Sequence, residues 1–194
     1  MKIFTTQNKK LISKTAILIV WLLFWQILFI IVKKQILIPS PISVVKTFFY
    51  ICFKLSFWFT IFHSFIRILI GYLFSVFLGI LFAVLCHHNK ILYQFFSPAI
   101  QVMKATPVAS FSIIVLLWIQ TDFVPVVISF LMVFPLIWIN ISIGIQQTEK
   151  QYLEMAKVYG FSAFKTCRYI YIPSVLPYFI SACHAGIGMA WKAG

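Results

Sequence analysis

Long apolar runs without charged side chains constrain this chain more than any other feature of its sequence. A helix needs about 20 residues to cross the roughly 30 Å hydrocarbon core of a membrane. Five runs approach that length, at residues 15–32, 68–86, 105–121, 123–148 and 169–191. Each should be helical, because an unpaired backbone group in lipid costs several kcal/mol. The sequence therefore predicts an all-α polytopic membrane bundle of about five spans.

The composition agrees with a membrane protein. Of the 194 residues 62% are hydrophobic, and the only acids are Asp122, Glu149 and Glu154, so too little polar surface remains to cover a water-soluble core. The 16 lysines and arginines are scattered between apolar runs. The net charge of +13 therefore does not indicate nucleic-acid binding, and we expect the basic residues to orient the chain in membrane lipid.

We predict two domains in the chain. Residues 1–60 would hold the first span and an interfacial helix, and residues 61–194 would hold the remaining spans. The interfacial helix is expected over 42–55, which mixes lysines with apolar side chains in the way that helices lying on a membrane surface do. Ser40 would cap this helix and Pro41 would open it.

The distribution of basic residues predicts the orientation in the membrane. With the N-terminus inside, ten lysines and arginines fall on the cytoplasmic side and five outside. The ten are Lys2, Lys9, Lys10, Lys14, Lys90, Lys104, Lys150, Lys157, Lys165 and Arg168, and the five are Lys33, Lys34, Lys46, Lys54 and Lys192. The four lysines around the first outer segment argue against this orientation, but the count places residues 147–172 in the cytoplasm.

Two spans carry a small residue at every fourth position. They are Gly71, Ser75, Gly79 and Ala83 in the second span, and Ala182, Gly186, Ala190 and Gly194 in the fifth. Such stripes let helix backbones approach closely, so they predict packing inside the bundle or at a subunit interface. Chance spacing is the alternative, and it is weaker for two runs of four than for a single pair.

The last three spans contain candidates for a translocation pathway. Pro135 would kink its helix and free backbone carbonyls. Asn140 and His184 are polar side chains inside predicted spans, where an ionisable group is a functional candidate. Two alternatives remain open: proline is common in membrane helices, and a neutral His184 could simply bond to a backbone carbonyl.

One polar segment, residues 147–172, separates the last two spans. Polar and apolar side chains recur with helical spacing over 147–159, which predicts a short amphipathic helix. Gly160 would end this helix in a left-handed conformation. A second short segment would then start at Phe161 and end at Pro173, which opens the last apolar run.

This segment resembles a known motif. Its order of Glu-x-Ala, three residues, Gly, nine residues and Ile-x-x-Pro is similar to the cytoplasmic Glu-Ala-Ala loop in the membrane subunits of bacterial ABC importers. The matching residues are Glu154, Ala156, Gly160, Ile170 and Pro173, whereas Met155 stands where the family usually has Ala and Ile172 where it has Leu. Within that superfamily, residues 64–67 with Gly71, 104–107 and 190–194 resemble the nitrate/sulfonate/taurine type of permease.

The resemblance implies a function and partners. The chain would be a permease subunit in a bacterial inner membrane, working as a homodimer with two ABC ATPase subunits and an extracytoplasmic solute-binding protein. ATP and Mg²⁺ would bind the ATPase, with no cofactor on this chain. The solute would be a small compound such as a sulfonate, nitrate, taurine or a thiamine precursor. Since the family has a sixth span, the resemblance also implies a C-terminally truncated bundle.

The same resemblance assigns roles within the polar segment. Glu154, Met155 and Ala156 would lie on a helix that docks on the ATPase, Gly160 would turn the chain, and Pro173 would join the segment to the fifth span. A structural role for Glu154 is the alternative, because Lys150 and Lys157 lie four residues before and three after it and could pair with it on one helix face.

Other functional classes find less support. The four cysteines lack metal-ligand spacing, and no catalytic carboxylate pair or phosphate-binding glycine loop is present. The sequence thus predicts no enzyme and no metal site. A secondary transporter or channel not coupled to ATP is the alternative function, but it would need ionisable groups inside its spans, which hold only His184 and Arg67. We interpret Arg67 as an interfacial anchor, and His87 and His88 as a solvated loop.

Overall fold

The computed structural model describes residues 2–194, with side chains described from Ser13 onward. Every regular element within those residues is a helix. Four helices are long and apolar enough to cross a membrane, and a bent helix pair raises this number to five. The predicted all-α bundle of about five spans is confirmed. The chain forms two compact units, which divide between Thr60 and Ile61.

The first unit contains α1 (Lys2–Val32) and α2 (Pro41–Cys52). The apolar part of α1 covers Ser13–Val32, and the helix ends where Lys33 takes a φ of 52°. Ser40 caps α2, since its Oγ accepts the N–H of Ser43 at 3.2 Å. The indole N–H of Trp25 donates to the carbonyl of Pro39 at 3.1 Å, which ties α1 to the turn before α2.

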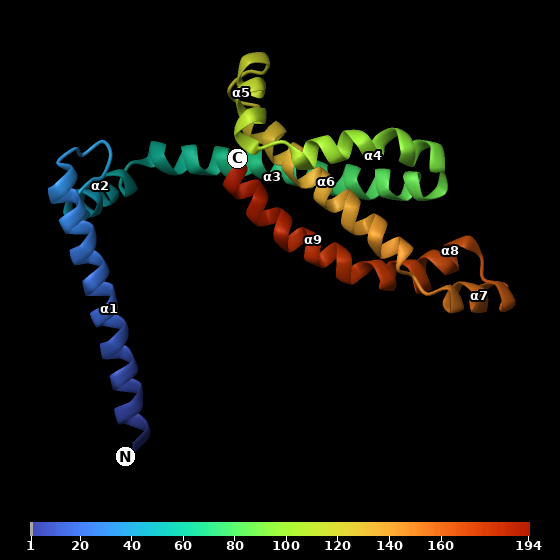
Figure 1. The fold of residues 1–194 in the computed structure, drawn as a ribbon, viewed down its shortest axis with the longest axis horizontal. Helices are drawn as coiled ribbons and strands as arrows, with labels where there is room; N and C mark the ends of the chain where they lie inside the picture. Colours follow the sequence, from blue (N-terminus) through green and yellow to red (C-terminus); the bar gives the residue numbers. More distant parts are fainter. Residues whose placement is uncertain (1) are drawn as a thin grey trace. The chain divides into compact units, whose positions relative to one another are not determined.

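The second unit is a helical bundle, with the polar segment at one end between α6 and α9 (Figure 1). Its helices are α3 (Leu55–His88, which begins in the first unit), α4 (Lys90–Ala105), α5 (Val108–Trp118), α6 (Val124–Gln146), α7 (Lys150–Val158), α8 (Ala163–Thr166), the π-helix η1 (Cys167–Tyr171) and α9 (Ile172–Ala193).

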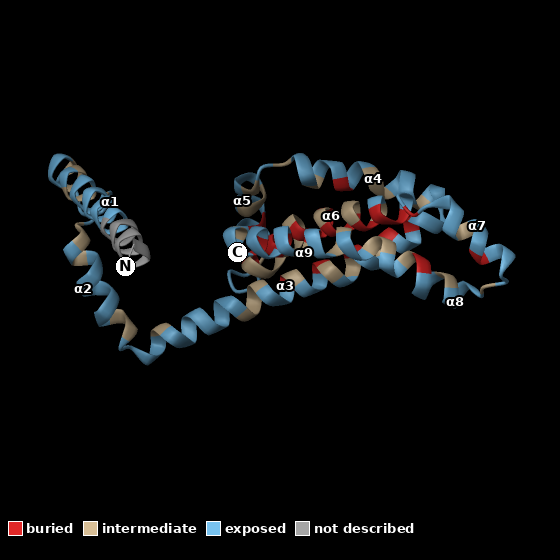
Figure 2. Ribbon diagram, turned by 90° about the horizontal axis from the view of Figure 1, so that it is seen from below, coloured by how far each residue is buried: buried red, intermediate tan, exposed pale blue. Residues whose placement is uncertain are grey.

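Helix α6 lies at the centre of this unit, with α3, α4 and α9 packed around it (Figure 2). Its side chains supply much of the buried core, which includes Val133, Ile137 and Ile141. Aromatic rings extend the contact to the neighbouring helices, since Phe82 of α3 meets Phe134 of α6 edge-on with ring centroids 5.8 Å apart. A helix that is apolar on all sides is typical of the centre of a bundle.

The predicted single span over 105–121 is wrong. The chain instead forms α4 and α5, which meet at an angle of 104°. Thr106 and Pro107 both have extended backbone angles, with ψ of 129° and 139°, because a proline disfavours the helical conformation of the residue before it. Lys90 and Lys104 then lie at opposite ends of α4, separated by about 21 Å of helix rise.

The second predicted span is longer than the sequence analysis expected. Helix α3 begins at Leu55 instead of residue 68, and it continues through His87 and His88, which were expected in a loop. No proline or glycine interrupts residues 55–67, and arginine is itself a good helix former, so nothing ends the helix at Arg67. The interfacial helix before it is correspondingly shorter and stops at Cys52.

Candidate functional site

Helix α7 is a short helix that is mostly exposed. It begins at Lys150, three residues later than the sequence predicted, and Ala156 is its buried residue. Glu154 and Met155 are exposed, and Val158 and the capping Tyr159 keep 84% and 74% of their surface exposed. An exposed apolar face on a polar helix is an unusual surface for an isolated chain and is typical of a docking surface.

Gly160 turns the chain after α7. Its φ of +63° is in the left-handed region, which disfavours residues with a side chain. The N–H of Gly160 donates to the carbonyl of Lys157 at 3.1 Å, and the N–H of Phe161 donates to the carbonyl of Ala156 at 2.8 Å. These two bonds form a Schellman motif, which satisfies carbonyls that the end of the helix leaves unpaired.

After this turn the chain runs without a break into the last span. Ser162 caps α8, since its Oγ accepts the N–H of Lys165 at 3.3 Å, and α8, η1 and α9 follow one another directly over Ala163–Ala193. The prediction that Pro173 ends a separate segment is wrong. Proline normally breaks a helix, because it has no N–H and its ring clashes with the carbonyl four residues earlier. Here the preceding turn is a wider π turn, in which the N–H of Ile172 donates to the carbonyl of Cys167. This turn accommodates Pro173 within the helix.

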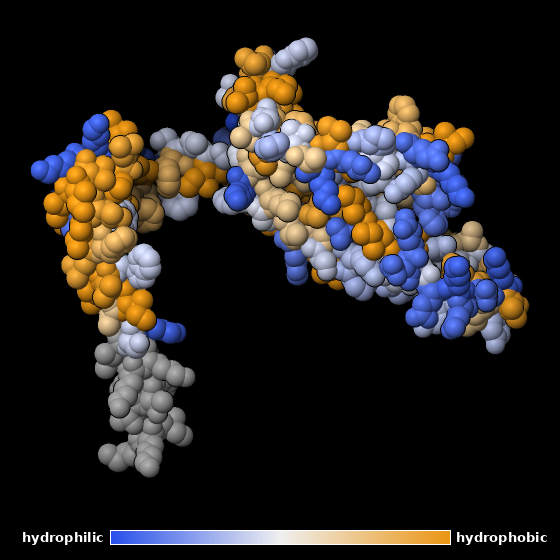
Figure 3. All heavy atoms as spheres, in the orientation of Figure 1, coloured by the Kyte–Doolittle hydropathy of each residue, from blue (hydrophilic) through white to orange (hydrophobic). Residues whose placement is uncertain are grey.

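The motif residues therefore occupy two arms joined at Gly160. Glu154, Met155 and Ala156 lie on α7, whereas Ile170, which is buried, lies in η1 and Pro173 lies at the start of α9. Figure 3 shows hydrophilic side chains gathered over the α7–α8 end of the second unit. Within the part of the chain with described side chains the one ion pair is Arg67–Asp122. Glu154 is thus not paired with Lys150 or Lys157.

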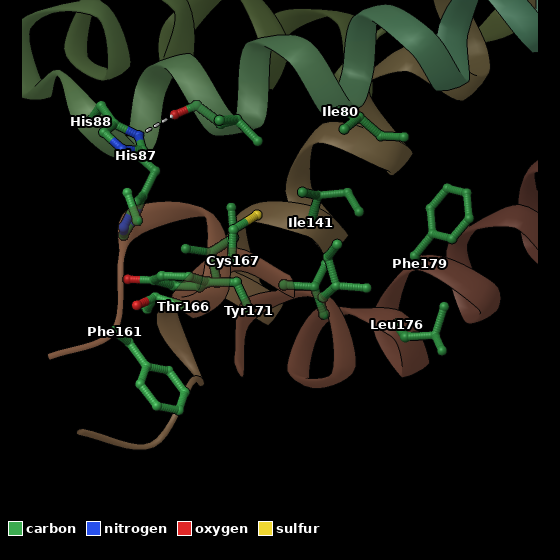
Figure 4. Close-up of a pocket in the computed structure, with 15 residues that line it drawn as sticks. Ile80, His87, His88, Ile141, Phe161, Thr166, Cys167, Tyr171, Leu176 and Phe179 are labelled. Atoms are coloured by element: carbon green, nitrogen blue, oxygen red, sulfur yellow. Dashed lines mark hydrogen bonds between the residues drawn. The ribbon is translucent and has the colours of Figure 1, made fainter. Parts of the chain in front are cut away.

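An apolar cleft of about 670 Å³ lies beside this polar segment (Figure 4). Its walls come from the end of α3, from α6 and from the α8–η1–α9 stretch, and they include Ile141, Tyr171 and Phe179. The few polar groups on the walls include the rings of His87 and His88. Such a lining suits apolar groups better than a small charged solute.

The small residues of α3 face α6. Gly71 and Gly79 leave no room for a side chain, since a Cβ on Gly71 would collide with the carbonyl oxygen of Val126, and one on Gly79 would lie 2.7 Å from Ile137 Cγ2. Ser75 is buried between them, and its Oγ lies 2.8 Å from the carbonyl oxygen of Gly71 and 3.1 Å from that of Phe130. Ala83 is buried on the same face.

The small residues of α9 face the same central helix. A Cβ on Gly186 would lie 3.1 Å from Val133 Cγ1 of α6 and 3.4 Å from the ring of Tyr72 of α3. Ala182 and Ala190 are buried, and the Oγ of Ser129 lies 3.4 Å from the carbonyl oxygen of Ala190. The two stripes thus lie within the packing of one chain, although nothing in the sequence shows that α6 is their common partner.

The three pathway candidates have different surroundings. Pro135 is buried inside α6, the Asn140 amide donates to the carbonyl of Leu136 at 2.8 Å within its own helix, and His184 lies on an exposed face of α9. The Asn140 amide is thus bonded within its own helix. A local backbone bond was the alternative left open for His184. No such bond is present for His184 in the described structure.

Arg67 has an ion-pair partner that was not predicted from the sequence. Its Nη2 lies 2.9 Å from Oδ1 of Asp122, in the connection between α5 and α6, with the two side chains 35% and 73% exposed. An arginine and one of only three acids in the chain could have suggested an ion pair, but Arg67 and Asp122 are 55 positions apart in the sequence. Their encounter follows from the packing of α3 on the start of α6, where Gly71 lies against Val126.

No metal centre is evident in the described part of the chain, where His, Cys, Asp and Glu form no group of three or more. The four cysteines are unpaired thiols at Cys52, Cys86, Cys167 and Cys183.

Comparison with known proteins gives a consistent result. Residues 75–193 match the family model described as "Binding-protein-dependent transport system inner membrane component". The chain is 26% identical, over 96% of its own length and 70% of the relative's, to the nitrate import permease protein NrtB of Synechocystis sp.. It is 30% identical, over 66% of its length, to the nitrate import permease protein NrtB of Synechococcus elongatus, of which it spans 46%.

A third relative is the formylaminopyrimidine transport permease protein ThiX of Halalkalibacterium halodurans, which is 25% identical over 92% of this chain and 72% of the relative. The predicted resemblance to importer permeases of the nitrate/sulfonate type is confirmed. The matched family model covers most of the second unit, including α7, Gly160 and α9. This chain therefore belongs to the family of binding-protein-dependent transport system inner membrane components.

Proposed function

We propose that this chain is the permease subunit of an ATP-driven importer and that α7 docks on a separate ATPase subunit. The observation that carries the proposal is the continuous connection from α7, through the Gly160 turn, to α8, η1 and the membrane span α9. A force applied to α7 would be transmitted to α9, because no flexible linker lies between them. Rigid-body movement of a helix pair is what alternating access requires.

The surface of α7 supports a docking role. Tyr152, Met155, Val158 and Tyr159 are exposed apolar or aromatic side chains on a helix that contributes only Ala156 to the buried part of its own chain. Glu154 lies among them without an ion pair in the described structure. A partner could therefore bury apolar and aromatic area around a single acidic group, and Tyr and Met are among the residue types enriched in interface cores.

The proposed assembly contains two copies of this chain, two ATPase subunits and an extracytoplasmic binding protein. In this assembly ATP and Mg²⁺ are held by the ATPase, and this chain performs no catalysis of its own. We place Pro135, Asn140 and His184 in the spans that would line the pathway, with His184 the one whose side chain is exposed. The small-residue stripes hold α3 and α9 against α6 within each copy.

The transported solute is proposed to be a small compound of the kinds named for the relatives, whose names specify nitrate import and formylaminopyrimidine transport. A sulfonate or taurine-like anion belongs to the same proposal. A secondary transporter or channel that works without ATP is the second candidate, but it offers no reason for the exposed α7 surface or for its rigid link to α9.

Site-specific photo-cross-linking in the native membrane tests the proposal. A cross-linking amino acid at Tyr152 on α7 should give an adduct with a protein that carries an ABC ATPase nucleotide site. The control is the same amino acid at Leu117 of α5, which is more exposed than Tyr152 (78% against 48%) but lies outside the polar segment. An ATPase adduct at Tyr152 and none at Leu117 supports the proposal, whereas no ATPase adduct at Tyr152, or equal adducts at both positions, contradicts it.

A further inference from the structure

A second, smaller pocket lies where the end of α3, the start of α4 and the end of α6 meet. Its volume is about 190 Å³. Ala83, Cys86 and Ser142 line it from the bundle, and His87, Lys90 and Gln146 contribute polar atoms around them. Its lining is thus more polar than that of the apolar cleft described above, and its charged group is a lysine.

The hydroxyl group of Ser142 is an unpaired polar group in this pocket. Its Oγ is shielded from solvent and has no hydrogen-bond partner in the described structure. Other helical hydroxyls of this chain bond to the carbonyl four residues earlier, as Ser75, Ser112 and Thr148 do. Ser142 departs from that pattern, and a buried hydroxyl without a partner costs about 1–3 kcal/mol, so a ligand in the pocket would stabilise it.

One helical turn earlier on α6, the indole N–H of Trp138 is also buried and has no partner. The ring of Trp138 stacks on Tyr93, a pocket-lining residue of α4, with centroids 5.5 Å apart and planes at 20°. Two unsatisfied donors thus occur within four residues of one helix. Buried polar atoms of this kind are rare in folded proteins and indicate water, an ion or a ligand.

The charge around the pocket favours an anion. Lys90 is the first residue of α4, whose first turn contains no acid, and a cation at that end of a helix is repelled by the partial positive charge of the free N–H groups. None of the chain's three acids lines the pocket. No carboxylate pairs with Lys90 among the residues with described side chains.

The volume limits the size of the ligand. A water molecule occupies about 30 Å³ in the liquid, so 190 Å³ corresponds to about six waters. This space accepts one tetrahedral oxyanion with some water but not a nucleotide. We propose that the pocket binds a single phosphate group, with the ammonium group of Lys90 and the hydroxyl of Ser142 as donors. This inference does not depend on the transport function proposed above.

The phosphate could come from an anionic phospholipid or from inorganic phosphate, and a binding experiment on the delipidated, purified full chain separates the two. Native mass spectrometry would measure occupancy with phosphatidylglycerol, with diacylglycerol, which lacks the phosphate, and with inorganic phosphate. We expect binding of phosphatidylglycerol but not diacylglycerol. Binding in the inorganic phosphate arm as well would identify a site for the free ion.

The variants Lys90→Gln and Ser142→Ala each remove one proposed donor. Each should weaken phosphate-dependent binding by roughly tenfold or more, which is the usual effect of losing a hydrogen bond to a charged group. Lys104→Gln is the matched control, because it removes the same charge at the other end of α4, and it should bind like the unsubstituted chain.

Three results overturn the proposal. They are no binding of either phosphate probe, equal binding of diacylglycerol and phosphatidylglycerol, and unchanged binding by both Lys90→Gln and Ser142→Ala. Each variant alters a different helix and removes a side-chain group without adding volume, so a folding defect in one leaves the other as the test. The thermal unfolding of each variant without lipid is the check for such a defect.

Discussion

The N–H of Phe161 donates to the carbonyl of Ala156 at 2.8 Å, across a turn in which Gly160 has a φ of +63°. This bond fixes the direction in which the chain leaves α7. Since α8, η1 and α9 follow without a break, the direction of α7 and the position of the last span are linked through one residue.

Gly160→Val should disturb this turn without disturbing the bundle. No atom lies within 4 Å of a Cβ built on Gly160, so the cost is that of the left-handed backbone, about 1–2 kcal/mol. We expect weaker co-purification with the ATPase subunit and normal membrane insertion. Gly188→Val on α9 is the control, because its Cβ also meets no neighbour but its φ is not positive. Normal co-purification of the Gly160 variant would contradict this role of the turn.

Gly79→Ala should destabilise the bundle, whereas Gly188→Ala should not. Alanine favours a helix over glycine by up to about 1 kcal/mol, and Gly188 has open space for the methyl group. A Cβ on Gly79 would lie 2.7 Å from Ile137 Cγ2, and overpacking costs about 1–3 kcal/mol, more than the propensity gain. Thermal unfolding of the purified chain would compare the midpoint temperatures of the two variants. A midpoint for Gly79→Ala at or above that of Gly188→Ala would contradict the prediction and show that the contact between α3 and α6 can relax.

The ion pair between Arg67 and Asp122 should contribute little to stability. Asp122 is 73% exposed, and exposed pairs contribute at most about 1 kcal/mol. A double-mutant cycle with Arg67→Gln and Asp122→Asn, read by thermal unfolding at low and high salt, should give a small coupling energy that salt reduces. A coupling energy well above 1 kcal/mol that does not depend on salt would show a buried, structural pair instead.

The orientation of the chain can be tested by labelling. In a variant without Cys52, Cys86, Cys167 and Cys183, a cysteine at Gln151 should react with a membrane-impermeant thiol reagent only after the cells are broken. Exposure of Gln151 in the structure makes it accessible once the reagent reaches it. Labelling in intact cells would place α7 outside the cytoplasm and remove the basis for docking on an ATPase.

The sequence predicted those parts of the fold that depend on neighbouring residues. Hydrophobic run length identified α1, α6 and α9, and the Ser40-Pro41 pair marked the start of α2. The glycine at position 160 was correctly placed in the left-handed region, because little else explains a glycine directly after an amphipathic helix. The stretch at 105–121 was misjudged because run length ignores the effect of Pro107 on Thr106.

The remaining features depend on residues far apart in the sequence. Spacing showed that Gly71 and Gly79 share one helix face, but not that Val126 and Ile137 of α6 cover it. The pairing of Arg67 with Asp122 joins α3 to the connection before α6. The pocket around Ser142 requires α3, α4 and α6 to meet in space. The role of Pro173 was missed for another reason: a π turn lets a proline remain inside a helix where an α-helical turn would break.

The central claim is that Glu154 couples this chain to ATP hydrolysis rather than stabilising its fold. Glu154 is exposed and has no ion pair in the described structure, and even an exposed pair on one helix would contribute only about 0.3–0.5 kcal/mol. At a docked surface the same carboxylate would be buried against a partner, where losing one side of a polar pair leaves the other unsatisfied.

The most direct measurement is ATP hydrolysis by the assembled complex in liposomes, with and without loaded solute-binding protein. Glu154→Ala should lower the stimulated rate and leave expression and thermal unfolding of this chain unchanged. Glu149→Ala, which removes the same charge just before α7, should retain the stimulated rate. An unchanged stimulated rate in Glu154→Ala together with a lower unfolding temperature would contradict the claim and make Glu154 a structural residue.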